Sequence, residues 1–173
     1  VIDKLHSKTI QLSNSPINFP WDIFTVNGQE IKNDIKLLGL KPNPEKLSST
    51  NTLLGNEIYI EDGASCECAI LNTTNGPVYL GKDSEVMEGC TVRGPFALGE
   101  HATLKMQTKI YGDTTVGPHC KVGGEVSNSV LFGYSNKGHD GFIGNSVIGE
   151  WCNLGADTNN SNLKNNYGKV KAY

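Results

Sequence analysis

The sequence predicts a mainly β protein, a parallel β-helix built from hexapeptide repeats and preceded by short α-helices. The first observation is a strict period of six residues from Leu80 to Val126, which matches neither a helix nor an alternating strand. The second is that this stretch divides into eight consecutive repeats of this period, called sixes below, and a branched aliphatic residue opens every one of them. Six of the eight carry a small residue in fifth place. The third is the composition: 20 glycines and only 37% hydrophobic residues fit a chain that turns often around a thin core.

The repeat gives every residue of a six an expected place in the coil. Each six should form one short flat side, with its first and fifth residues pointing into the core. Three sixes should complete a triangular coil, so residues eighteen apart should stack at the strand spacing of about 4.8 Å. The expected aliphatic core positions are Leu80, Val86, Val92, Leu98, Leu104, Ile110, Val116 and Val122. Less regular sides begin near Leu53, with inward candidates Ile58, Ile60, Ala64, Ala69 and Ile70.

The segment before the coil has helical signals. Pro20 marks a helix start, Asn27-Gly28 reads as a break, and Gly39 reads as a stop. We therefore expect one or two short amphipathic helices that cover the open end of the coil. A Pro-rich polar linker should follow over residues 40–49. The expected domains are residues 1–52, a helical and linker segment that follows a further domain, and residues 53–173, a β-helix that is truncated at its C-terminal end.

Composition excludes several classes of function. The net charge is −3 and no basic stripe is present, so nucleic-acid binding is not expected. No apolar run is long enough for a membrane span, which leads us to expect a cytoplasmic protein. The cysteine count of five is odd, and Cys90, Cys120 and Cys152 fall in the small inward place of a six. We expect packed, reduced thiols, and the Cys66-Glu-Cys68 spacing does not fit a zinc pair.

The repeat fails between Ser127 and Gly141 and returns at Ile148. A segment that leaves the stack is where a repeat protein is expected to carry its function. His139 lies in this segment and is a candidate general base, because neutral imidazole accepts protons near pH 7. The alternative is a turn histidine bonded to backbone.

Residues 137–162 carry a more specific pattern. It reads Lys137-Gly-His-x-x-Phe142-Ile-Gly, then Ile148-Gly-x-x-x-Asn153-Leu-Gly-Ala156-x-Thr, then Asn162. This pattern resembles the C-terminal acetyltransferase domain of the bifunctional bacterial enzymes that acetylate glucosamine-1-phosphate and then uridylylate it. The spacing from His139 to Asn153 to Gly-Ala156-x-Thr agrees with that domain without a gap, and residues 80–162 as a whole can be laid on it. The resemblance implies a left-handed β-helix, a homotrimer, and a place within a sugar-1-phosphate nucleotidyltransferase.

The resemblance also implies a role for each matching residue. His139 falls on the catalytic base that deprotonates the sugar amine before the amine attacks acetyl-CoA. Asn153 falls on a residue that contacts the reacting groups, and the Ala156 N–H falls where the family stabilises the oxyanion. The implied substrate-binding positions are Lys109 at the sugar phosphate, Phe142, and Asn162 reached from the adjacent subunit. Acetyl-CoA would be a substrate, and Mg²⁺ would belong to the nucleotidyltransferase domain, whose phosphate-cradling Gly-rich loop this sequence lacks.

Three departures from the family pattern keep a non-enzymatic alternative open. The family's Tyr is Phe142 here, a second basic phosphate position is Ser127, and Asp157 puts negative charge near the expected CoA. These residues favour a β-helix that trimerises or regulates a nucleotidyltransferase without chemistry of its own.

A metal enzyme of the γ-carbonic-anhydrase type is a further alternative. His101 and His119 are eighteen residues apart and should stack, but a third ligand would be needed. No metal ligands are assigned. Separately, four basic residues are candidates for a phosphate-facing surface: Arg93, Lys105, Lys109 and Lys121.

Overall fold

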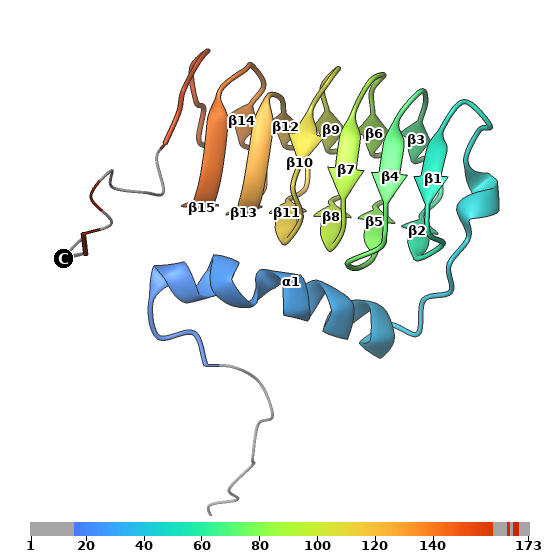
Figure 1. Ribbon diagram of the computed structural model, residues 1–173, viewed down its shortest axis with the longest axis horizontal. Helices are drawn as coiled ribbons and strands as arrows, with labels where there is room; N and C mark the ends of the chain where they lie inside the picture. Colours follow the sequence, from blue (N-terminus) through green and yellow to red (C-terminus); the bar gives the residue numbers. More distant parts are fainter. Residues whose placement is uncertain (1–15, 161–165, 167, 170–173) are drawn as a thin grey trace, which may run out of the picture.

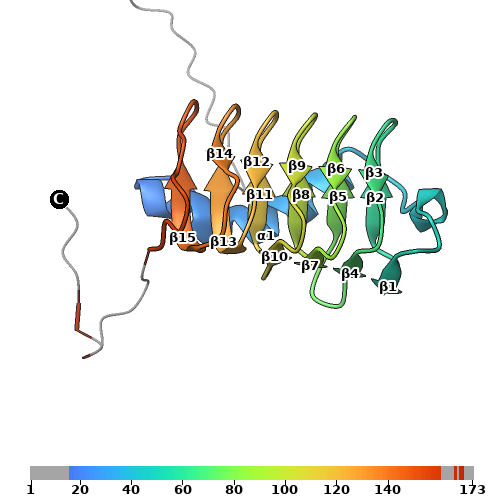
Figure 2. The ribbon, with the colours of Figure 1, turned by 90° about the horizontal axis from the view of Figure 1, so that it is seen from above.

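The computed structural model describes residues 16–160, 166, 168 and 169, and the described chain forms a parallel β-helix with one long helix along its side (Figure 1). Every strand pairs in parallel with the strands of the neighbouring coils. Seen from above, the strands of successive coils line up in columns (Figure 2). The mainly β fold class expected from the repeat is confirmed.

The coil has three faces. Face 1 holds β1 (Thr52–Leu54), β4 (Ile70–Asn72), β7 (Thr91–Arg93) and β10 (Lys109–Ile110). Face 2 holds β2 (Ile58–Ile60), β5 (Val78–Leu80), β8 (Phe96–Leu98) and β11 (Thr114–Val116). Face 3 holds β3 (Ser65–Cys66), β6 (Glu85–Val86), β9 (Thr103–Leu104), β12 (Lys121–Val122) and β14 (Asn136–Lys137). The two longest strands, β13 (Glu125–Leu131) and β15 (Phe142–Ile148), pair with each other along their length and continue from face 1 into face 2.

The core has the composition that the sixes predict. All sixteen first and fifth positions from Leu80 to Val126 are at most 2% exposed. Leu80 pairs with Leu98, and Leu98 pairs with Val116, which confirms the eighteen-residue stacking. Burial of these side chains contributes roughly 25 cal/mol for each Å² of apolar surface removed from water, so the column of aliphatics is a main source of stability.

One early core position differs from the expectation. Ile58, Ile60 and Ala69 are buried, but Ile70 is exposed and Leu71 takes the inward place in β4. Successive residues of a strand point to opposite sides, so a shift of one residue exchanges the inward and outward positions.

The interruption expected between Ser127 and Gly141 does not leave the stack. The segment forms most of β13 and all of β14, and Leu131 pairs with Val116 while Lys137 pairs with Val122. Both partners are fifteen residues apart instead of eighteen, because this coil turns its corners with fewer residues. The expectation of an extruded loop is therefore wrong, and the change of register is a shorter coil.

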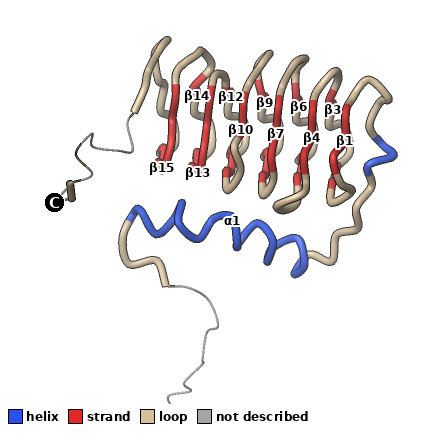
Figure 3. The backbone as a smooth tube through the Cα atoms, viewed as in Figure 1, coloured by secondary structure: helices blue, strands red, loops and turns tan. Residues whose placement is uncertain are grey.

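The N-terminal segment forms one helix, α1 (Pro20–Leu37), as Figure 3 shows. The Asp22 carboxylate accepts hydrogen bonds from the backbone N–H groups of Asn18 and Phe19, and this fixes the start of the helix. Gly39 follows the end with a φ of 62°, so the expected stop is confirmed. The break expected at Gly28 is wrong, because Gly28 is buried inside the helix.

Helix α1 covers face 2 and not the open end of the coil (Figure 1). Its buried Ile31 and Ile35 pack with Tyr59 of β2. The side chain of Asn27 donates to the backbone oxygen of Asp113 at 2.8 Å and accepts from the Thr115 hydroxyl at 2.8 Å. The end-capping role expected for the helix is therefore wrong.

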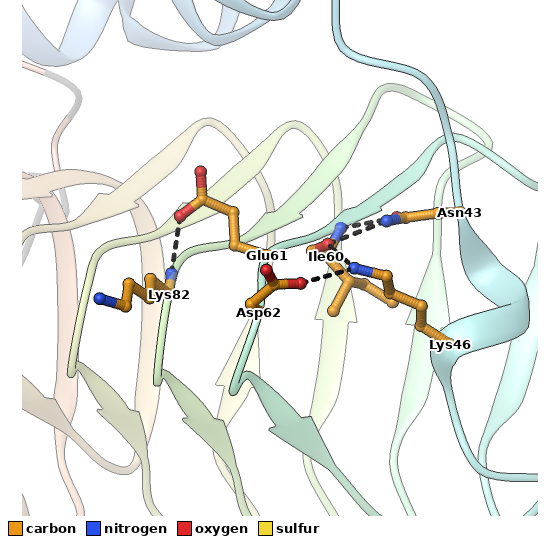
Figure 4. Close-up of polar contacts among 6 residues, drawn as sticks. All are labelled: Asn43, Lys46, Ile60, Glu61, Asp62 and Lys82. Carbon is orange, nitrogen blue, oxygen red and sulfur yellow. Dashed lines mark hydrogen bonds and ion pairs between the residues drawn. The ribbon is translucent and has the colours of Figure 1, made fainter.

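Residues 43–51, which include most of the linker predicted over residues 40–49, cover the first coil instead. They include a 3-10 turn, η1 (Pro44–Lys46). The Asn43 side chain accepts from the N–H of Ile60 at 2.8 Å and donates to its oxygen at 2.9 Å, as a neighbouring strand would (Figure 4). Lys46 pairs with Asp62 at 3.1 Å, and the Lys82 N–H donates to Glu61.

Asn51 forms a similar pair of bonds on the next side of the coil: its side chain donates to the Cys66 oxygen and accepts from the Ala69 N–H. These side chains satisfy backbone groups that an open edge would leave without partners.

Candidate functional site

Two of the three candidate catalytic residues, His139 and Ala156, lie on stacked turns at one corner of the coil. We call the corner between face 3 and face 1 that holds residues 138–141 the site corner. His139 and Asp140 lie exposed in its bend, between β14 and β15. Within the described part of the chain, the His139 imidazole forms no hydrogen bond or ion pair. Its backbone oxygen is held, because it accepts a hydrogen bond of 2.7 Å from the Lys137 ammonium.

Ala156 lies one coil beyond His139 at the same corner. The N–H of Asp157 donates to the backbone oxygen of Asp140 at 3.0 Å, which stacks the two turns directly. Ala156 is exposed, and its N–H has no partner among the described residues. An N–H in this state is available to an external acceptor.

Asn153 precedes this turn on face 3. It forms a parallel bridge with Asn136, and the next residue, Leu154, donates its N–H to the Asn136 oxygen at 2.8 Å. Asn153 is exposed. The structure therefore places His139 and Ala156 on stacked turns of the last two described coils, with Asn153 on face 3 three residues before Ala156.

The site corner changes length from one coil to the next. Three residues separate the inward Val122 from Val126, but five separate Lys137 from Ile143. The His139 turn is thus the longer one and stacks over a shorter one. Gly123 permits this approach, because a Cβ there would lie 2.8 Å from the Gly138 oxygen.

The expected phosphate position lies on face 1. Lys109 opens β10 beside Thr91 of β7, and Arg93 lies beside Tyr111 in the same two coils. Together with Ile110 they line a hollow of about 220 Å³. In the part of the chain that the structure describes, neither cation pairs with a carboxylate. The proposed four-residue basic surface is not continuous, because Lys121 lies on face 3 and Lys105 follows β9 at the site corner.

Phe142 connects this face to the site corner. It opens β15 and is half-buried, and its N–H donates to the Asn159 side chain at 2.7 Å. Phe142 pairs with Glu125, which pairs in turn with Lys109. The acidic residue Glu125 therefore lies between Lys109 and Phe142 on this face. Ser127 is in β13, paired with Gly144. Asn162 lies outside the described residues.

Lys137 is a site residue that the sequence reasoning missed. It occupies the inward aliphatic column after Leu104 and Val122, and it is 2% exposed. Burial lowers the pKa of its ammonium, while Asp140 and Asp157 act to raise it. The signal was present, because restarting the sixes at Leu131 puts Ser135 in the small fifth place and Lys137 in the next aliphatic place.

The two histidines considered for a metal stack as expected, at a different corner, between face 2 and face 3. Their ring centroids are 4.9 Å apart, and Tyr134 and Trp151 extend the stack at 4.8 and 4.6 Å. His101 also lies 3.3 Å from a carboxylate oxygen of Glu100. His139 lies at the site corner and does not join this stack. Among residues 16–160, 166, 168 and 169, no three His, Cys, Asp or Glu side chains gather to hold a metal ion.

The cysteines are free thiols where the structure describes them. Cys90 and Cys120 are buried in the small inward places, as expected, and Cys152 is partly exposed. Burial raises the pKa of the Cys66 thiol to about 12, with a smaller contribution from Cys90. A thiol in this state is a poor nucleophile near pH 7.

Comparisons with known proteins add no family to this picture. No protein-family model and no curated protein matches the chain. No helix in the described ranges is both long and apolar enough to cross a membrane.

Proposed function

We propose that this chain is the β-helix part of a sugar-1-phosphate nucleotidyltransferase and that its site corner transfers an acetyl group from acetyl-CoA to an amino-sugar 1-phosphate. The observation that carries the proposal is the stacking of the His139 turn on the Ala156 turn. It puts the exposed His139 one coil before the exposed Ala156, whose N–H has no partner in the described chain. A base and an oxyanion donor are the two groups that acyl transfer to an amine requires.

The proposed chemistry uses these groups in order. The sugar amine attacks the thioester carbon, and His139 takes the proton that the amine loses. The carbonyl oxygen becomes an oxyanion and accepts a hydrogen bond from the Ala156 N–H. The intermediate collapses when the C–S bond breaks, and the CoA sulfur leaves as a thiolate that takes the proton from His139. Asn153 contacts the reacting amine and acetyl group.

The phosphate of the substrate is assigned to face 1. Arg93 and Lys109 line the same hollow and have no carboxylate partner in the described chain, so both are available to an anion. Glu125 lies between Lys109 and Phe142 and disfavours a second negative charge closer to the site corner. We therefore assign the phosphate to the Arg93 side of Lys109. Asn162 of an adjacent subunit in a homotrimer would complete the sugar site.

A second candidate is a non-catalytic trimerisation or regulatory module in a cytoplasmic nucleotidyltransferase. The observation that favours it is the pair of carboxylates at the site corner, Asp140 and Asp157, whose turns stack on each other. They would repel an anionic CoA.

The test is release of CoA thiol from acetyl-CoA by the longer parent protein, with glucosamine-1-phosphate or galactosamine-1-phosphate as the acceptor. His139→Ala should lower kcat by about 10²–10⁴-fold, the usual contribution of a general base. The matched control is His101→Ala, an exposed histidine at the other corner, which should keep the wild-type rate. An unchanged rate in His139→Ala would show that the base is wrongly assigned. A full-length trimer that binds neither substrate would support the non-catalytic module.

A further inference from the structure

Lys137 is a buried amine at a position that elsewhere holds an aliphatic residue. It pairs with Val122, which pairs with Leu104, and both of these neighbours are fully buried. Burying a charged or strongly polar group in an apolar column is unfavourable unless a specific partner compensates. An aliphatic residue would occupy this column without a desolvation penalty, so the lysine is expected to cost stability here.

The partner of the Lys137 ammonium identifies what the residue does. The ammonium donates to the backbone oxygen of His139 at 2.7 Å, from inside the coil outward. The ammonium is therefore hydrogen-bonded to the backbone of His139, the exposed histidine of the site corner.

The His139 turn has few other constraints of its own. Gly138 and Gly141 flank His139 and Asp140, and Gly141 has a φ of 120°, which glycine adopts most readily. The turn stacks over a coil that has two fewer residues at this corner. Its neighbours hold its two ends, through Gly123 N–H to the Lys137 oxygen at 2.6 Å and Glu125 N–H to the Gly141 oxygen at 3.1 Å. The following coil holds Asp140, whose oxygen accepts from the Asp157 N–H at 3.0 Å. In the described chain, the bond from the ammonium is the hydrogen bond that holds His139 itself.

We propose that Lys137 is a positioning residue for His139: its ammonium fixes the backbone of the turn from inside the coil and thereby sets the direction of the imidazole. The functional part of this inference depends on the proposed role of His139 as the base. The structural part, an ammonium that orders the turn, does not depend on it.

The test replaces Lys137 with Met, which fills the same column and cannot donate a hydrogen bond. In the full parent protein, Lys137→Met should lower kcat for acetyl transfer by about 10–100-fold, because small misplacements of a catalytic group have effects of this size. KM for both substrates should stay within about twofold, and Tm should be unchanged or higher. Lys121→Met is the control, since Lys121 lies one coil earlier on face 3 and is exposed. This variant should change neither kcat nor Tm.

Hydrogen exchange of the amides of residues 138–141 separates the two parts of the inference. Lys137→Met should exchange faster there than the wild type, while the amides of β12 and β9 keep their rates. This readout remains informative if the wild type transfers no acetyl group, in which case the proposed function fails and the ordering of the turn is still tested. An unchanged exchange rate at residues 138–141 would overturn the inference, and so would an unchanged kcat in an active enzyme.

A second change provides a rescue. Gly138→Ala stiffens the turn without a clash, because a Cβ at Gly138 would have nothing within 4 Å. Added to Lys137→Met, it should recover part of the lost kcat and slow the exchange. A parallel fall of Tm and kcat with no rescue would mean that Lys137 is only a core residue. If Lys137→Met does not fold, Lys137→Gln is subjected to the same measurements, with the same outcomes deciding.

Discussion

The approach of the shortened coil to the His139 turn can be tested at a single atom. In Gly123→Ala, the new Cβ would lie 2.8 Å from the Gly138 oxygen, 3.0 Å from the Gly138 carbonyl carbon and 3.3 Å from the His139 nitrogen. Ordinary contact begins at 3.4 Å, so the turn must retreat by about 0.6 Å (3.4 minus 2.8). All three atoms belong to the backbone, which cannot rotate away as a side chain would.

The magnitude follows from this displacement. Overpacking of this kind costs about 1–3 kcal/mol, and for a chain of this size each kcal/mol lowers Tm by about 2–4 °C. We therefore expect Tm to fall by roughly 2–12 °C. The movement also strains the 2.6 Å hydrogen bond from the Gly123 N–H to the Lys137 oxygen. If His139 is the base, a shift of this size should lower kcat by about tenfold or more.

The assay compares Gly123→Ala with Gly138→Ala by thermal unfolding and by acetyl transfer. Both variants add one methyl group to the same corner, but a Cβ at Gly138 would meet open space. Gly138→Ala should change the free energy of unfolding by less than about 1 kcal/mol, in the stabilising direction. Equal Tm and kcat in the two variants would refute the reasoning that the turn is held close against the shortened coil.

Two further predictions concern the core. Burial lowers the pKa of Lys137 in the folded protein below the ordinary value of 10.5 that it has in the unfolded chain. Between the folded and the unfolded pKa, the unfolded chain binds more protons than the folded one, so the free energy of unfolding rises with pH. Any gain in the free energy of unfolding of Lys137→Met over the wild type should therefore shrink as pH rises toward 10.5. Urea unfolding of both proteins at about pH 7 and about pH 10 measures this gain. A gain that does not change with pH would contradict the prediction. Separately, Phe96→Ala removes a fully buried side chain from a usually small place and should cost about 3–5 kcal/mol, while Phe132→Ala, at a residue that is 42% exposed, should cost much less. Similar losses in both variants, measured by chemical unfolding, would show that Phe96 is not a core residue in solution.

The candidate site was only partly predictable. His139, Asn153 and Ala156 belong to a local pattern, and the structure stacks the turns of His139 and Ala156 because residues seventeen apart pair in this part of the coil. Asn153 lies on face 3, before this corner. Their chemical roles remain predictions, as does the phosphate position. Arg93 and Lys109 line one hollow because β7 and β10 are neighbours, whereas Lys121 belongs to another face. The sequence offered these cations as one set because it does not show which face each residue occupies until the register is known.

By itself, the sequence determined the repeat and the core. A coil with a narrow interior holds an aliphatic residue and, in six of the eight repeats, a small residue on each side, so the sixes from Leu80 to Val126 reveal the inward positions directly. Tertiary structure alone decided where α1 lies, because its contacts, such as Asn27 with Asp113, join residues 86 positions apart. It also decided that residues 127–141 stay in the stack and bring Lys137 into the core. The physical reason is that a coil can lose residues at its corners and keep its backbone hydrogen bonds, which changes the period in the sequence while the stacking continues.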